Sequence, residues 1–244
     1  ADQMGGQPIT DFTGALEVEG VDTSQYDAVG ITHSPTLSVT EVRVSGSEPE
    51  WKRYPVFGME ESFINHSTLT FGQRATGYET DEAIVEALRT QPNVAVIDAF
   101  AVPQSGDIGA NENTLYLTGL HSDDKVFDPI TIDVLSPVDG ANHEVTIIGI
   151  IDTKLGSLAG LYASQETIDT IYGEFAATFY FVSLKDPDGA AAASQEIEAA
   201  LLSSGVQGNS IRDELEETQS LENGFLYIIE GFMGLGLLVG IAAV

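Results

Sequence analysis

Residues 130–151, ITIDVLSPVDGANHEVTIIGII, carry the clearest structural signal in the chain. The runs Ile130–Leu135 and Val145–Ile151 are rich in β-branched residues, which favour strands. Pro137, Asp139 and Gly140 stand between the two runs and favour a turn. The stretch therefore predicts two strands joined by a turn, within a strand-rich region.

Further elements are predicted on both sides of this pair. Alternating or continuous apolar runs predict strands at residues 26–45, 54–57, 94–102, 177–184 and 206–211. Apolar residues at helical spacing, with start and stop residues at their ends, predict helices at residues 8–18, 80–92, 164–173 and 191–202, and one that begins near Arg212. Strands and helices do not alternate regularly, which favours the α+β class.

The order of elements also predicts the domain organisation. Each end of the chain carries an α/β unit, and the middle is rich in strands. We expect a terminal α/β (βαβ-type) sandwich built from residues 1–45 and 176–222, and a strand-rich subdomain inserted at residues 46–175. Residues 223–244 are expected to form a stalk and the start of a transmembrane helix.

Residues 225–244, FLYIIEGFMGLGLLVGIAAV, have the character of a membrane helix with its far end missing. They carry one charge, Glu230, and a spanning helix needs about 20 mainly apolar residues. We therefore expect an extracytoplasmic piece of a larger membrane protein, delivered by an earlier membrane helix because residues 1–10 lack signal-peptide features. The alternative is a buried helix of a soluble domain. Glycine weakens such a helix by about 1 kcal/mol, whereas Gly236 and Gly240 form a close-approach pair suited to membranes.

Composition narrows the partners of the protein. Its 244 residues are 43% hydrophobic, enough for a core, and include no cysteine. With 38 acidic against 9 basic residues, the net charge of −29 disfavours nucleic acid and anionic lipid as partners. A surface adapted to high salt, one adapted to low pH and an ordinary acidic extracellular domain all fit this charge.

Motifs for chemistry are not evident in the sequence. It holds no G-x-S-x-G, no Walker A loop and no H-E-x-x-H, and its four histidines are far apart. The loop at residues 121–128 clusters carboxylates, which could bind calcium, but its spacing differs from that of an EF-hand. We expect no catalytic residue, no cofactor and no enzymatic activity, with any ATPase activity on a separate subunit or domain.

Several stretches of the chain resemble a known family. The segment GFMGLGLLVGIAAV, Gly231–Val244, is similar to the helix by which the large extracytoplasmic domain re-enters the membrane in ABC transporter permeases of the FtsX/MacB type. Weaker similarities lie, in the family's order and spacing, at Tyr54–Glu60, Val94–Pro103, Val145–Asp152, Gly160–Ser164, Phe179–Leu184 and Ile197–Gly205.

The resemblance implies a two-part α+β module (a MacB-like periplasmic core) between the first and second membrane helices of a permease, on the extracytoplasmic side of the cell membrane. Its implied partners are a cognate cytoplasmic ATPase, a second permease in a homo- or heterodimer, and an extracytoplasmic adaptor or substrate. Family members export peptides or drugs, release lipoproteins or signal to wall enzymes, and the pattern does not choose among these roles.

Under this interpretation the function is mechanical, and the C-terminal helix acts as a stalk that relays ATP-driven motion. Its packing positions are predicted to be Leu221, Phe225, Ile229, Gly231, Met233, Gly236 and Gly240. A membrane-anchored acidic domain that binds an extracellular ligand or cation is the alternative function, and a secreted enzyme of an unrecognised type is a third.

Overall fold

The computed structural model describes residues 9–46, 50–66, 69–103, 115–152, 158–173, 175–214 and 216–217. The chain forms two compact units: unit 1 is Ala1–Thr23 with Asp186–Val244, and unit 2 is Ser24–Lys185. Helices and one large mixed sheet together make the α+β class that the sequence predicts. Residues 26–45 and 176–185, which we expected in the terminal unit, group with unit 2 because their strands pair within its sheet.

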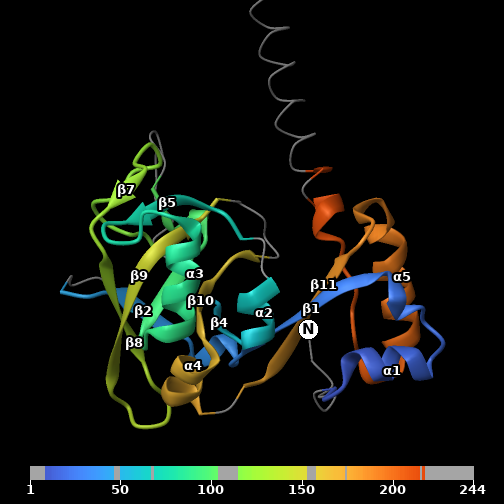
Figure 1. Ribbon diagram of the computed structural model, residues 1–244. Coiled ribbons are helices and arrows are strands. Elements are labelled where there is room, and N and C mark those ends of the chain that lie inside the picture. The colour runs from blue at the N-terminus through green and yellow to red at the C-terminus, as the bar shows by residue number, and fades with distance from the viewer. Residues whose placement is uncertain are drawn as a thin grey trace, which may run out of the picture. The chain divides into compact units, whose positions relative to one another are not determined.

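In the described residues of unit 2, eleven strands form one sheet, coloured blue to light orange in Figure 1. The main order is β11-β1-β4-β10-β6-β9-β8-β2-β3, with β5 beside β9 and β7 beside β5. β4–β10, β6–β9 and β5–β7 pair in parallel and the other pairs are antiparallel. The strands are β1 Tyr26–Ser34, β2 Glu41–Val44, β3 Lys52–Arg53, β4 Val56–Met59, β5 Phe71–Ala75, β6 Val94–Ile97, β7 Val126–Phe127, β8 Ile130–Leu135, β9 Asn142–Ile151, β10 Leu161–Ser164 and β11 Ala177–Leu184.

The two strands predicted at residues 130–151 are confirmed as the antiparallel pair β8–β9. The turn between them is closed by hydrogen bonds from the Ser136 N–H to the Ala141 carbonyl and from the Gly140 N–H to the Ser136 carbonyl. Gly140 adopts φ 70°, which is accessible to glycine without steric cost. Most apolar side chains of β8 and β9, among them those of Ile132 and Ile147, are buried in the core.

Two predicted strands are shorter than expected. The strand predicted at residues 26–45 is two strands, β1 and β2, because Pro35 follows β1 and the chain then turns through the 3₁₀-helix η2, Leu37–Val39. The strand predicted at residues 94–102 ends at Ile97, because Asp98 caps the 3₁₀-helix η3, Ala99–Ala101, with its carboxylate. Both breaks arise from local side-chain chemistry that overrides a run of strand-forming residues.

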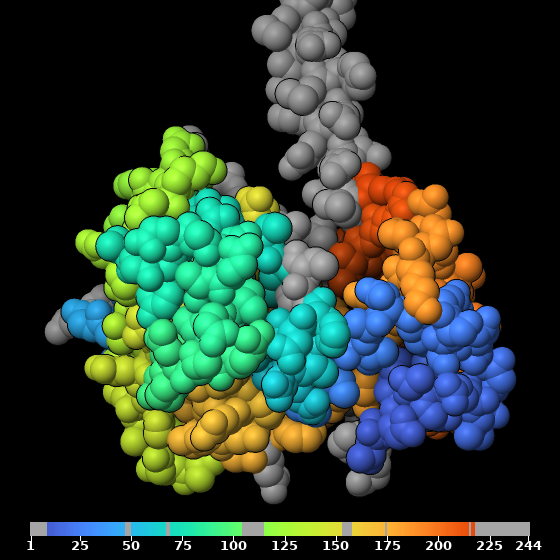
Figure 2. Space-filling view, viewed as in Figure 1, coloured from blue at the N-terminus to red at the C-terminus, as the bar shows by residue number. Residues whose placement is uncertain are grey.

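Helices cover both faces of the sheet in unit 2. These are α2 Glu61–His66, α3 Asp81–Thr90, capped by Thr80, and α4 Gln165–Tyr172, capped by Ser164. A Cβ at Gly30 of β1 would lie 2.9 Å from Phe63 of α2, and one at Gly58 of β4 would lie 2.3 Å from the Gln165 side chain. Gly30 and His33 are three residues apart on β1, so their Cβ positions lie on opposite faces of the sheet. His33 pairs with Gly58 and shares its face, and therefore α2, beside Gly30, and α4, beside Gly58, cover opposite faces. Figure 2 shows α2 and α3 side by side on the α2 face.

The described part of unit 1 is helical. Helix α1, Phe12–Val18, is capped by Asp11 and packs against α5, Ala190–Leu201. The strand predicted at residues 206–211 is wrong: residues 206–210 have no regular structure and a helical turn begins at residue 211. Val206 donates its N–H to Leu201, and a Cβ at Gly208 would lie 2.4 Å from the Ser194 carbonyl oxygen, so this segment follows α5 closely instead of joining a sheet.

No helix in the described ranges is long and apolar enough to cross a membrane. The predicted stalk and membrane segment, residues 223–244, lies outside those ranges.

Candidate functional site

The predicted stalk-packing residues all lie outside the described residues; they are Leu221, Phe225, Ile229, Gly231, Met233, Gly236 and Gly240. The first turns of the predicted helix are described, because residues 211–214 and 216–217 are helical. The start of that helix near Arg212 is therefore confirmed, and the described residues that lead into it form the candidate site.

A two-stranded ribbon carries both chain connections between the units. β1 pairs with β11 from Tyr26↔Leu184 to Ser34↔Ala177, but it pairs with β4 only at Thr32 and His33. The first part of β1 thus has β11 as its one strand partner among the described residues, as Figure 1 shows. The chain enters unit 2 just before β1 and leaves it just after β11. We call these two strands the linker ribbon.

The end of the linker ribbon next to the unit boundary is closed by Lys185. Its backbone N–H donates to the Gln25 carbonyl at 3.0 Å, and its Nζ donates to the Ser24 carbonyl at 2.7 Å. These bonds hold the incoming and outgoing strands together at the last residue of unit 2.

On the unit 1 side, an ion pair joins the C-terminal helix to the segment that follows β11. Arg212 Nη1 lies 2.5 Å from Asp188 Oδ1, and Arg212 Nε donates to Glu216 at 2.9 Å. The hydrogen bonds to Glu216 and then to Asp188 raise the pKa of Arg212, so its charge is retained at any physiological pH. Asp188 belongs to the 3₁₀-helix η5, Pro187–Gly189. The start of the predicted stalk is thus tied to a turn directly beyond the linker ribbon.

The opposite end of the linker ribbon holds a buried histidine. His33 Nε2 lies 2.7 Å from Glu60 Oε1, and its Nδ1 lies 2.9 Å from Thr178 Oγ1. A neutral imidazole that donates from Nε2 to the carboxylate accepts at Nδ1 from the threonine hydroxyl. The ring also packs on Phe175 at a centroid distance of 4.1 Å. His33 therefore ties β1 to β11 and to the residue after β4 through its side chain.

A buried carboxylate organises the centre of the sheet. Asp98 is fully buried and accepts hydrogen bonds from the Tyr54 hydroxyl, the Gly160 N–H and the Phe100 N–H. Burial raises the pKa of Asp98, and these three hydrogen bonds partly oppose the rise. Burial also raises the pKa of Tyr54 and of the neighbouring Tyr162. The cluster joins the ends of β6 and β10 and has no access to solvent, so its role is structural.

The described residues bring no metal-binding group together: no three His, Cys, Asp or Glu side chains among them are arranged to hold an ion. In the loop at residues 121–128, Asp124 accepts a hydrogen bond from the His121 N–H. Its carboxylate thus stabilises the turn of the loop itself.

Sequence reasoning missed both His33 and Asp98. Asp98 carried a usable signal, an acid inside the apolar run VAVIDAFAV, because an acid in such a run has to be hydrogen bonded once it is buried. His33 carried no comparable signal, since its partners lie on β11 and after β4, far away in the sequence.

Comparisons with known proteins include a likeness to a solved structure. No family model and no curated protein matches this chain. A solved structure of the extracellular domain of the noncanonic ABC-type transporter YknZ from Gram-positive bacteria is similar over 83% of this chain and 88% of that chain, with 13% identity and a TM-score of 0.38. A likeness at this identity and TM-score decides neither the family nor the function of the present chain.

Proposed function

We propose that this chain is the extracytoplasmic domain of an ABC transporter permease and that it relays ATP-driven helix movement to a substrate or partner outside the membrane. The linker ribbon is the observation that carries the proposal. Both chain connections between the units lead directly into its paired strands, so motion carried along the chain from the terminal unit reaches unit 2 at a hydrogen-bonded ribbon. Packed rigid elements of this kind transmit displacement between distant sites.

The path of the relay begins at the C-terminal helix. Movement of that helix pulls on Asp188 through Arg212, then on the end of β11, then on β1 through Lys185 and the ladder of the ribbon. The apolar sequence of residues 225–244 and its resemblance to the membrane helix of FtsX/MacB-type permeases support a membrane origin for the motion. In this proposal the protein contributes no catalytic group, and ATP is hydrolysed on a cytoplasmic partner.

The test uses the intact gene product in membranes. An ABC-type ATPase is expected to co-purify with it, and an epitope placed in the exposed turn at Gly77 is expected to be accessible from outside the cell. Failure to recover any ATPase, with the epitope still outside, would favour the alternative of a membrane-anchored acidic binding domain. An epitope accessible only from the cytoplasm would contradict both functions.

The relay itself is tested by separating the helix from the turn. Arg212→Gln removes the bonds to Asp188 and Glu216, and it should lower the stimulation of ATP hydrolysis or the export activity of the intact complex. Arg89→Gln is the matched control, because Arg89 forms an exposed ion pair with Glu86 in α3, away from the linker ribbon. Equal activity of the two variants would argue against this path.

A further inference from the structure

The linker ribbon packs lightly against the core of unit 2. None of the eight side chains of β11 is buried, although residues 179–182 are aromatic or apolar, whereas all four side chains of β6 in the middle of the sheet are buried. The register of β1 against β11 also shifts between Tyr26 and Ala28, as at a β-bulge. Strands with few buried apolar contacts deform at a lower free-energy cost than core strands. The linker ribbon is therefore a part of the sheet that can bend.

The start of α2 holds β1 at one residue in the middle of the ribbon. The Ile31 N–H donates to Ser62 Oγ at 3.2 Å, and the Glu60 N–H donates to the Ile31 carbonyl at 3.0 Å. Both backbone groups of Ile31 are therefore bonded to the chain that begins α2. We call Glu60–Phe63 the α2 turn.

Side chains beside this point let the ribbon lean on α2. A Cβ at Gly30 would lie 2.9 Å from the Phe63 Cα, so only glycine allows β1 to come this close to the α2 turn. The Phe63 ring meets Phe181 of β11 edge to face at a centroid distance of 4.9 Å, and Phe57 of β4 meets Phe179 of β11 in the same way at 5.4 Å. Aromatic pairs are favourable over centroid distances of about 4.5–7 Å, so these contacts survive a small displacement of the ribbon.

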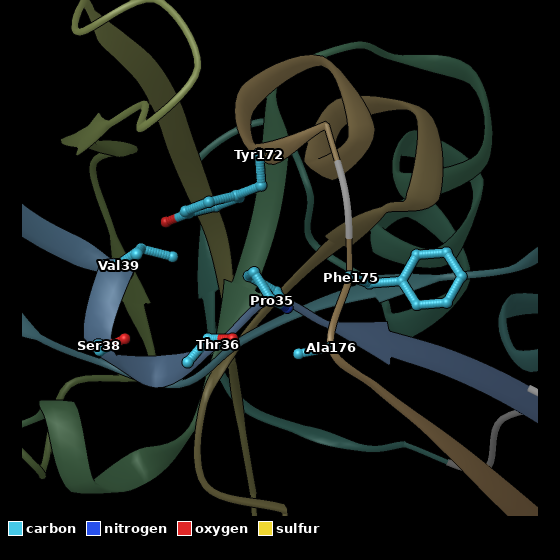
Figure 3. Close-up of a pocket in the computed structure, with 7 residues that line it drawn as sticks. All are labelled: Pro35, Thr36, Ser38, Val39, Tyr172, Phe175 and Ala176. Atoms are coloured by element: carbon cyan, nitrogen blue, oxygen red, sulfur yellow. The ribbon is translucent and has the colours of Figure 1, made fainter. Parts of the chain in front are cut away.

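The end of the ribbon away from the unit boundary is anchored to the sheet. His33 pairs with β4 through its backbone and holds Glu60 and Thr178 through its ring. The Ala176 N–H donates to the Ser34 carbonyl at 2.8 Å. Figure 3 shows Ala176 just beyond this end, where it lines a cavity beside the turn that follows β1. The ribbon is thus fixed on one side of the α2 turn, and on the other side β1 has β11 as its one strand partner among the described residues.

We propose that the α2 turn is a pivot on which the linker ribbon bends. The outer half of the ribbon, residues 26–29 with residues 182–184, moves as one piece because its two strands are paired. The inner half, residues 32–34 with residues 177–179, stays with the sheet. The bend loads α2, and through it α3, which packs beside α2. Bending is a property of unit 2 and does not depend on the proposed transport function.

Spin labels on the purified full chain test the bend, and the absence of cysteine from the sequence makes their placement specific. Asp27→Cys labels the outer half, Ala177→Cys labels the inner half, and Glu86→Cys on α3, with its side chain 59% exposed, is the common reference. We call Asp27–Glu86 the outer distance and Ala177–Glu86 the inner distance. Double electron–electron resonance should give a broader distribution for the outer distance than for the inner one. Distributions of equal width, or a broader inner one, would show that the ribbon does not bend here and overturn the proposal.

Removing one bond of the α2 turn tests its role as the pivot. Ser62→Ala deletes the hydroxyl that accepts from Ile31, so it should broaden the outer distance further and leave the inner distance unchanged. Ser62→Thr keeps a hydroxyl and should restore the native width. Thr170→Ala is the matched control, because its hydroxyl bonds to the Glu166 carbonyl within α4, and it should change neither distance. An unchanged outer distance in Ser62→Ala, or equal broadening of both distances, would refute the pivot.

A second variant displaces the ribbon instead of loosening it. Gly30→Ala places a methyl group 2.9 Å from the Phe63 Cα, so the ribbon has to move away from α2. The mean outer distance should shift and the mean inner distance should stay, with circular dichroism checking that the variant is folded. An unchanged outer distance in the folded variant would show that α2 yields instead of the ribbon, and would contradict the bend.

Discussion

The hydroxyl of Tyr54 donates to Asp98 Oδ2 at 2.5 Å in the interior of unit 2, and the Gly160 N–H donates to the same oxygen. Tyr54 precedes β4, Asp98 follows β6 and Gly160 precedes β10. The Asp98 carboxylate therefore connects the ends of three neighbouring strands. A buried charge is tolerated only with such partners, and removing a donor leaves it incompletely satisfied.

Replacing Tyr54 with Phe should therefore destabilise the protein by about 1–3 kcal/mol, because Asp98 loses a donor that solvent does not replace. Urea denaturation measures the free energy of unfolding. Tyr78→Phe is the control, since the Tyr78 hydroxyl makes an exposed hydrogen bond to Gln91, and its effect should stay within ~0.5 kcal/mol. Equal stability of the two variants would contradict a structural role for the Asp98 cluster.

The raised pKa of Asp98 predicts a pH dependence of known sign. The folded protein holds the proton of Asp98 more tightly than the unfolded chain, whose pKa is near the ordinary value of 3.8. The contribution of this group to stability is therefore fully present below pH 3.8 and is lost as the pH rises through the folded-state pKa.

Asp98→Asn removes this titration and supplies the comparison. As the pH rises from below 3.8 toward neutrality, the unfolding free energy of the native protein should fall relative to that of Asp98→Asn. The test is how this difference changes with pH, because the amide substitution itself alters stability by an amount that does not depend on pH. A difference that is independent of pH would show that the pKa of Asp98 is the same in the folded and unfolded states.

Gly160 is predicted to be intolerant of any side chain. It adopts φ 153°, and a Cβ would lie 2.5 Å from the Phe57 ring and 3.1 Å from the Pro55 carbonyl oxygen. Gly160→Ala should cost about 1–3 kcal/mol from overpacking in addition to the cost of its backbone conformation. Gly77→Ala isolates the backbone term, because Gly77 has φ 93° with open space around it. The thermal unfolding temperature of Gly160→Ala should be clearly lower than that of Gly77→Ala. The reverse order would exclude the steric explanation.

The acidic surface predicts stabilisation by salt. The net charge of −29 produces self-repulsion in the compact state, and the Debye length falls from about 30 Å at 0.01 M to about 8 Å at 0.15 M salt. The urea midpoint should therefore rise with NaCl over this range, and KCl should act alike if screening is the cause. A midpoint insensitive to both salts would mean that the carboxylates are spaced widely enough not to repel.

Much of the local structure could be predicted because its causes act over a few residues. Thr80 caps α3, Ser164 caps α4 and Gly173 ends it, and the β8–β9 turn lies where Pro137 and Gly140 indicated. The misplaced strand at residues 206–211 shows the limit of such reasoning. Residues 206–210 have no regular structure and follow α5 closely, so the tertiary contacts of this segment, and not its own residues, decided its conformation.

The amino-acid sequence by itself determined the α+β class, the acidic surface and most helix and turn positions, since periodicity, capping and charge are properties of neighbouring residues. Only the tertiary structure decided which strands pair: β10 lies between β4 and β6, and β1 lies between β11 and β4. It also decided that Tyr54, Asp98 and Gly160 meet and that His33 lies against Thr178. The physical reason is that every strand edge offers the same backbone donors and acceptors, so the choice of partner depends on how the buried faces of the whole unit pack together.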